Sequence, residues 1–264
     1  MKLTFLGTGS AFTMKNWQTN MLVDIGGEKM LIDCGSDIRW ALAEQGMSYL
    51  DIGSVFVSHL HADHIGGLEW LAFGTYFDPR YDFQPALYSP KIIVDSLWNN
   101  SLSGGLSSIQ GQSNRLSSYF EVFPVEKNGQ FNMRDDLQDV IFKPVQTIHI
   151  MNEWYQEPSF GLMVESVKKK HKMFITCDTQ HCPAQISTFY HMADIIFHDC
   201  ETAPYQSGVH AHYDQLRTLN RGTKAKMWLC HYQDNVVENW DEWQTKAKLD
   251  GFAGFVKKGQ TFEF

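Results

Sequence analysis

The residues best suited to chemistry lie in one stretch, His59-Leu60-His61-Ala62-Asp63-His64, where three imidazoles and a carboxylate fall within six residues. Imidazole nitrogen and carboxylate oxygen are ligands that suit zinc and similar divalent metals. The stretch directly follows an apolar segment typical of a strand, so a tight loop is expected there. On such a loop the first two histidines can point to one metal while the other two ligands reach a second. Two metals about 3.5–4 Å apart can share ligands and hold both ends of an in-line displacement at phosphorus.

This stretch is one of several motifs that follow one another along the chain. LTFLGTGSAF comes first, and LIDCG, VSHLHADHIGGL, SFGLMVES and ITCDT follow. In this order they resemble the metallo-β-lactamase superfamily, whose signature is His-x-His-x-Asp-His, and the resemblance spans the whole chain. It implies a metal-dependent hydrolase with an α/β fold, an αββα sandwich of two mixed β-sheets packed face to face with helices outside.

The resemblance also implies the remaining metal ligands. His149 would be the third histidine of the first metal, Asp178 would bridge both metals, and His231 would complete the second. Two divalent ions per chain are therefore expected, with zinc preferred and manganese as the alternative. The predicted metal set is His59, His61, Asp63, His64, His149, Asp178 and His231.

Two further motifs resemble the ribonuclease Z branch of the superfamily, which has a His-Glu-Ala-Thr-like segment followed by a second histidine motif. Here the segments 198–202 (HDCET) and 209–213 (VHAHY) occupy those places. Asp199 stands where the branch usually has Glu, and as a carboxylate it can still orient a histidine or relay a proton. The resemblance implies a histidine general acid, and the choice between His210 and His212 stays open. The predicted catalytic set is Asp63, His198, Asp199, His210 and His212.

The substrate class is inferred from chain length and charge. Ribonuclease Z enzymes hold tRNA with a long arm between the third histidine motif and the bridging aspartate, whereas only 29 residues separate Asp178 from His149. The net charge is −8, while proteins that grip long nucleic acids usually carry basic surfaces. These features favour a small phosphodiester. Within the branch, the chain resembles the phage anti-Pycsar phosphodiesterases, which implies hydrolysis of 3′,5′-cyclic mononucleotides to nucleoside monophosphates and evasion of cyclic-nucleotide signalling against phages.

Other functions stay open at this point. The chain could be a tRNase Z-type endoribonuclease, or another small-molecule hydrolase such as a sugar cyclic phosphodiesterase, a lactonase or a thioesterase. It could also be a non-catalytic nucleotide-binding protein. The complete ligand set argues against the last, because a pure binder has no need for a centre that activates water. A substrate panel separates the others.

The elements that position these residues are expected to form a single domain over residues 1–264. Strands are predicted over 2–6, 21–24, 30–33, 54–58, 140–145, 161–165, 173–176, 194–198, 226–231 and 254–256, and helices after Ser36 and over 183–192, 213–220 and 239–249. Residues 75–120 are rich first in aromatics and then in Ser and Gly. This composition predicts a loop or lid insertion, whose aromatics, such as Tyr76 or Tyr119, would stack on the base of a nucleotide.

The cysteines and the N-terminus bear on location and assembly. Five cysteines without a Cys-x-x-Cys pair are typical of reduced, mostly buried thiols, and Cys200 is expected to be one of them. No apolar run approaches the ~20 residues of a membrane span, and the N-terminus lacks the apolar region of a signal peptide. We therefore expect a cytoplasmic protein, in the host cytoplasm if a phage encodes it. The aromatics of the 75–120 insertion also predict a homodimer in which this insertion helps close the partner's active site.

Overall fold

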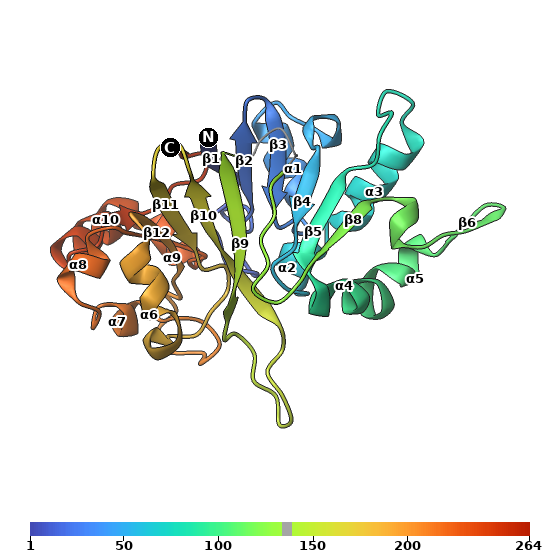
Figure 1. Cartoon of the computed structure of the whole chain (residues 1–264). Coiled ribbons are helices and arrows are strands. Elements are labelled where there is room, and N and C mark those ends of the chain that lie inside the picture. The colour runs from blue at the N-terminus through green and yellow to red at the C-terminus, as the bar shows by residue number, and fades with distance from the viewer. Residues whose placement is uncertain (134–138) are drawn as a thin grey trace.

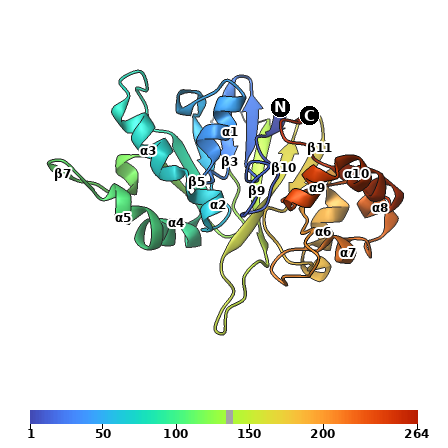
Figure 2. The same cartoon turned by 180° about the vertical axis from the view of Figure 1, so that it is seen from behind.

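The computed structural model describes residues 1–133 and 139–264 and contains two β-sheets packed face to face, with helices on both outer faces (Figures 1 and 2). The seven-stranded sheet has the order β15-β1-β2-β3-β4-β5-β8, and the six-stranded sheet has the order β14-β13-β12-β11-β10-β9. Both sheets mix parallel and antiparallel pairs. The predicted αββα sandwich is therefore confirmed.

The seven-stranded sheet comes mainly from the first half of the chain. Its strands are β1 (Lys2–Phe5), β2 (Met21–Ile25), β3 (Glu28–Ile32), β4 (Ser54–Phe56), β5 (Ala86–Pro90), β8 (Glu121–Val125) and β15 (Thr261–Glu263). The helices in this half are α1 (Ile38–Glu44), α2 (Ala62–Ile65), α3 (Leu68–Phe77), α4 (Lys91–Leu97) and α5 (Ser103–Leu106), with short turns η1 (Tyr49–Asp51), η2 (Trp98–Leu102) and η3 (Leu116–Ser118).

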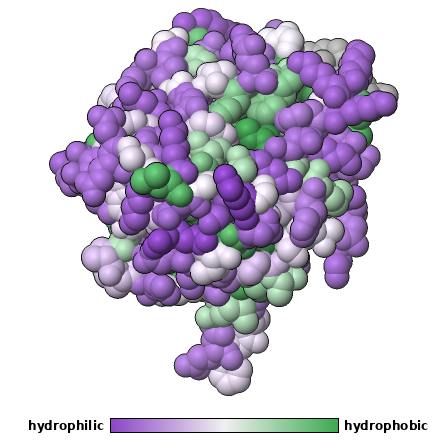
Figure 3. All heavy atoms as spheres, turned by 90° about the vertical axis from the view of Figure 1, so that its left-hand side faces the viewer, coloured by the Kyte–Doolittle hydropathy of each residue, from purple (hydrophilic) through white to green (hydrophobic). Residues whose placement is uncertain are grey.

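The six-stranded sheet comes from the second half. Its strands are β9 (Val140–Thr147), β10 (Ser159–Ser166), β11 (His171–Ile175), β12 (Ile195–Asp199), β13 (Met227–Cys230) and β14 (Gly254–Phe255). The helices are α6 (Pro183–Met192), α7 (Tyr213–Leu216), α8 (Arg221–Lys224), α9 (Asp234–Glu238) and α10 (Trp240–Leu249). The surface on the side of α8 and α10 is mostly hydrophilic (Figure 3). None of the helices in the described ranges has the length and hydropathy that a membrane span requires.

Apolar side chains from the two sheets meet in a shared core. Phe5 and Phe56 from the first sheet and Phe142 and Phe197 from the second are fully buried in one cluster between the sheets. Burial of each such side chain contributes about 1.5–3 kcal/mol. Two more clusters fill the spaces between each sheet and its covering helices. The sheets therefore share one packed interior, which holds the strand ends in fixed relative positions.

The segment over residues 75–120 differs from the predicted loop or lid. It contains the end of α3, the inner strand β5 and helices α4 and α5. Three tyrosines of this segment are buried, and the hydroxyls of Tyr81, Tyr88 and Tyr119 donate to backbone carbonyls. Aromatic composition misled the prediction because these tyrosines stabilise the core through the ring and the hydroxyl together. The hairpin of β6 (Ser108–Ile109) and β7 (Gln112–Ser113) extends away from the body (Figure 1).

Candidate metal centre

The predicted ligands come from strands that end at one edge of the two sheets. His59 follows β4, His149 follows β9, Asp178 follows β11 and His231 follows β13. Asp33, directly after β3, has a φ angle of 65°, and His231, directly after β13, has a φ angle of 62°. A left-handed backbone at a non-glycine residue is costly and persists where the surrounding structure over-determines it, often at functional sites. The strand ends therefore turn sharply, and each turn brings a polar side chain to the same place.

The first group of candidate ligands is His59, His61, His149 and Asp178. The Nε2 atoms of His59 and His149 lie 3.7 and 3.6 Å from Asp178 Oδ2. His149 Nε2 also lies 3.1 Å from His61 Nδ1. Two ligand atoms of a tetrahedral zinc site lie about 3.3–3.6 Å apart, given metal–ligand distances near 2.0–2.2 Å. The four atoms are therefore spaced as ligands of one ion would be.

The second group is Asp63, His64, Asp178 and His231. His64 Nε2 lies 3.2 Å from Asp63 Oδ2 and 3.3 Å from Asp178 Oδ1. His231 Nε2 lies 3.4 and 3.5 Å from the same two oxygens. Asp178 belongs to both groups and faces each with a different carboxylate oxygen. Its two oxygens can therefore bridge two ions.

Buried nitrogens support this assignment. His59 Nε2 and His64 Nε2 are shielded from solvent and have no hydrogen-bond partner. A buried polar atom without a partner costs roughly 1–3 kcal/mol, which a bound ion would remove. The residues present thus fit two divalent cations bound by nitrogen and oxygen.

The opposite ring nitrogens are held by the protein. His64 Nδ1 donates to Asp33 Oδ2 at 2.7 Å, and Ser58 Oγ donates to the same oxygen at 2.7 Å. His59 Nδ1 lies 3.0 Å from Ser58 Oγ, and His149 Nδ1 donates to the Val209 carbonyl at 2.8 Å. These contacts select the tautomer that leaves Nε2 for a metal.

Two positioning residues, Asp33 and Ser58, were not assigned a role from the sequence. Both are buried, and Asp33 reaches one histidine of each group, His64 directly and His59 through Ser58. The signal was present, because Asp33 lies in the LIDCG motif at a predicted strand end. A buried carboxylate at such a place needs partners.

The ionisable groups of the cluster shift one another's pKa values. Burial lowers the pKa of His59, and burial also lowers that of His149. Burial by itself would raise the pKa of Asp178, but His231 and His64 outweigh it and hold that pKa well below its usual range. Asp178 is therefore ionised, and His59 and His149 are neutral. These are the charge states in which carboxylates and imidazoles bind metals.

His210 lies beside the two groups, on Asp199. Its Nδ1 donates to Asp199 Oδ2 at 2.8 Å and lies 3.9 Å from Asp178 Oδ2. Burial by itself would raise the pKa of Asp199, but His210 and then His231 hold it at about 2. Asp178, Asp199, His210 and His231 also form a third cluster with metal-ligand spacing. His210 is thus a proton donor or an additional ligand at the edge of the centre.

Two other predicted catalytic histidines lie outside the cluster. His212 accepts from Asp214 N at 3.2 Å and donates to the Ala203 carbonyl at 3.0 Å, as the N-cap of α7. His198 is fully buried and accepts from Tyr190 OH at 2.6 Å; burial lowers its pKa to about 4. Neither residue belongs to a candidate ligand group, and the ring nitrogens of both are engaged by protein atoms. Of the two alternatives left open by the sequence, the geometry favours His210.

The cysteines take no part in this chemistry. All five are unpaired, and Cys200 is fully buried, as expected. Burial raises the pKa of the Cys200 thiol well above its usual range, so it is not a nucleophile.

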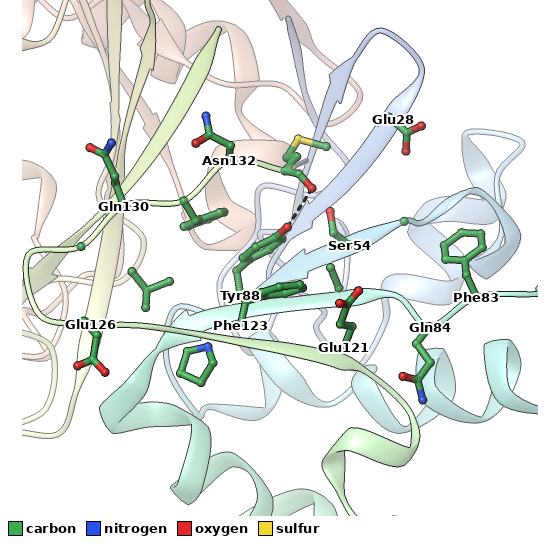
Figure 4. A pocket seen from close by; sticks show the side chains of 17 residues that line it. Glu28, Ser54, Phe83, Gln84, Tyr88, Glu121, Phe123, Glu126, Gln130 and Asn132 are labelled. Carbon is green, nitrogen blue, oxygen red and sulfur yellow. Dashed lines mark hydrogen bonds between the residues drawn. The ribbon is translucent and has the colours of Figure 1, made fainter. Parts of the chain in front are cut away.

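A large cavity of about 1080 Å³ lies elsewhere in the molecule (Figure 4). Gly53, Ser54 and Ala86 in its wall lie at the beginnings of β4 and β5, whereas His59 follows the end of β4. None of the residues lining it belongs to the three ligand clusters. Its size therefore does not make it the site of the metal chemistry.

Comparison with known proteins places the chain in a family. The family described as "Anti-Pycsar protein Apyc1" matches residues 1–262. The chain belongs to this family. The relative from Paenibacillus harenae, also named anti-Pycsar protein Apyc1, is 33% identical over 240 residues, which cover 89% of this chain and 91% of the relative. A relative of the same name from Bacillus phage vB_BveM-Goe7 is 32% identical over 246 residues, which cover 90% and 91% of the two chains.

Solved structures agree on the fold. The metallo-β-lactamase fold protein YhfI from Bacillus subtilis superposes with a TM-score of 0.70 at 17% identity, covering 99% of this chain and 98% of that one. The resemblance inferred from the motifs is thus confirmed for the family and for the fold. In this Apyc1 family member, the clustered histidines and aspartates are candidate ligands for divalent cations.

Proposed function

We propose that the protein is a phosphodiesterase that hydrolyses 3′,5′-cyclic mononucleotides to nucleoside monophosphates and so counters cyclic-nucleotide signalling against phages. The proposal rests on membership in the anti-Pycsar family and on relatives of that name in Bacillus phages. One structural observation supports phosphodiester hydrolysis. The hydrogen-bonded pair of His210 and Asp199 lies beside two groups of candidate ligands that share Asp178.

The ligand groups suit an attack at phosphorus. His59, His61, His149 and Asp178 would hold one ion, and Asp63, His64, His231 and Asp178 a second. We propose zinc in both positions, with manganese as the alternative. Two divalent ions held there would supply hydroxide at neutral pH and would neutralise charge on the phosphoryl oxygens. The residues contribute by orientation, because the contacts to Asp33, Ser58 and Val209 restrain three of the imidazoles.

His210 is proposed as the general acid. The departing ribose oxygen would leave as an alkoxide, which needs a proton. Since Nδ1 of His210 donates to Asp199, the imidazole ring is held with its Nε2 available to a substrate. The carboxylate of Asp199 also stabilises the charged ring before the proton moves.

The short connection between β9 and β10 supports a small substrate over tRNA. Residues 148–158 connect these strands and project from the body as a narrow loop (Figure 1). Its tip is organised locally, since Trp154 N and Tyr155 N both donate to Asn152 Oδ1. A loop of this length offers little surface for a long nucleic acid. The net charge of −8 also disfavours binding to a polyanion.

The test is product chromatography after incubation of metal-loaded protein with cyclic mononucleotides, a precursor tRNA and bis(p-nitrophenyl) phosphate. We expect turnover of cyclic mononucleotides to the linear monophosphates. Faster cleavage of the precursor tRNA would instead identify an endoribonuclease. Binding of cyclic nucleotide without turnover by protein that contains metal would identify a non-catalytic binder.

We further propose a cytoplasmic homodimer. The β6–β7 hairpin supports the dimer, because it extends from the body and most of its residues are exposed (Figure 2). Within its own chain it is held near Tyr76, whose hydroxyl donates to Gln112 at 2.9 Å. A partner subunit would bury this hairpin. We propose that residues 108–113, and not the whole 75–120 segment, reach the partner's active site.

A further inference from the structure

A cavity of about 500 Å³ lies between the start of α4, the turn after β8 and the paired strands β9 and β10. This volume falls within the range of about 300–1000 Å³ typical of small-molecule sites. Its walls include Ile92 from α4, Pro144 and Gln146 from β9, and Gln156, Pro158 and Phe160 from β10 and the loop before it. The opposite side is lined by Pro90, Lys91, Val125, Glu126, Lys127 and Asn128. The strand side of the cavity is therefore apolar with two amides, and the other side carries charged groups.

Hydrogen bonds connect these walls to the metal ligands. Phe160 N donates to the carbonyl of Ser58, the residue before His59, at 3.1 Å. Gln156 Nε2 donates to the Thr147 carbonyl at 2.7 Å, and Thr147 Oγ1 donates to the Asp178 carbonyl at 3.1 Å. Phe160 is thus hydrogen-bonded to the residue before His59, and Gln156 is connected to Asp178 through Thr147.

The side chains on the strand side of the cavity suit the chemistry of a nucleobase. The ring of Phe160 and the flat faces of Pro144 and Pro158 offer surfaces on which a planar base can stack, whichever base it is. The Gln156 amide is oriented by its bond to Thr147, which engages one N–H and leaves the other N–H and the carbonyl oxygen for a ligand. Gln146 adds a second amide, with both donor and acceptor atoms.

We propose that this cavity is the base-binding subsite of the enzyme. The phosphate would lie at the metal centre, and the base would enter between Phe160 and the prolines, where Gln146 and Gln156 contact its edge. This inference rests on the proposed function, because it takes a cyclic nucleotide as the substrate. It differs from the expectation that aromatics of the 75–120 segment, such as Tyr76 or Tyr119, bind the base; Tyr119 is buried, whereas Tyr76 is exposed.

The experiment compares two substrates in two variants. Gln146→Trp fills the cavity and Gln146→Leu removes only the amide. Each is assayed with a cyclic mononucleotide and with bis(p-nitrophenyl) phosphate, a diester without a base. We expect the ratio of kcat/KM between the cyclic nucleotide and the diester to fall at least tenfold in Gln146→Trp, mainly through KM, and by a smaller factor in Gln146→Leu. Lys143→Trp is the matched control, because Lys143 is exposed on the same strand and does not line the cavity.

The outcomes separate this inference from the proposed function. If the unmodified protein hydrolyses the cyclic nucleotide and Gln146→Trp keeps the same ratio, the subsite is refuted while the proposed function stands. Equal losses on both substrates in both variants would also refute it, because Gln146 would then act through the metal centre. If the unmodified protein hydrolyses only the base-free diester, the cyclic-nucleotide function itself fails.

Discussion

Replacement of His210 by alanine tests the proposed general acid directly. In the structure, His210 Nδ1 donates to Asp199 Oδ2 at 2.8 Å, and its ring centroid lies 4.8 Å from that of His149 and 4.7 Å from that of His231. The variant removes the imidazole and leaves the contacts of the two predicted ligand groups in place. Both groups should therefore still bind metal, and the loss should fall on the departure of the leaving group.

The expected size follows from what a positioned acid contributes. General acid catalysis is worth roughly 10²–10⁴-fold. We expect His210→Ala to lose about that factor in kcat on a cyclic mononucleotide, whose leaving group is an alkoxide. On bis(p-nitrophenyl) phosphate the loss should be less than about tenfold, because nitrophenolate departs with little help from an acid.

The assay is steady-state kinetics on both substrates, together with metal content. His212→Ala is the control, because His212 caps α7 and should cost stability of about 1 kcal/mol with no change in the ratio between the substrates. Equal losses on both substrates in His210→Ala with full metal content would refute the assignment. A selective loss in His212→Ala instead would transfer the role to that residue.

The remaining predictions concern the metals, the backbone and the assembly. Elemental analysis of active protein should find close to two divalent ions per chain, and active protein without metal would contradict the proposed chemistry. Asp63→Ala should lower the phosphodiesterase rate by several orders of magnitude and reduce the metal content towards one ion; unchanged turnover would show that the second ion is not used. A Cβ added to Gly35 would lie 2.1 Å from the Asp63 carbonyl, so Gly35→Ala should lower both the melting temperature and the metal content. Gly104→Ala is its control, since a Cβ built there meets no atom of the described residues within 4 Å outside its own helix backbone. Equal melting temperatures and metal contents in the two variants would rule out the close contact at Gly35. Light scattering at micromolar concentration should give a dimer that weakens when residues 108–113 are replaced by a short Gly-Ser turn; a monomeric mass for the unaltered protein would exclude the dimer.

The strands that carry the site were predictable because their pattern is local. Each of the ten predicted strands corresponds to an observed one with ends within two residues. The helix over Pro183–Met192 was also predicted with its observed ends, since proline at its first position is a strong local signal. The inner strand β5 was missed, because tyrosines and prolines around it resemble a loop when their buried partners are unknown.

Local features of the sequence were enough to predict the ligand chemistry of this protein. Three imidazoles and a carboxylate in six residues, with His149, Asp178 and His231 at later strand ends, predict a metal site because ligand type and strand-end position are local properties. Which side chains meet depends on the tertiary structure. It brings His61 within 3.1 Å of a histidine 88 positions later, and it separates His210 from His212, two residues apart, by turning the chain between Asp199 and α7. Such contacts depend on how the two sheets pack, and no local pattern records the distance between residues that packing brings together.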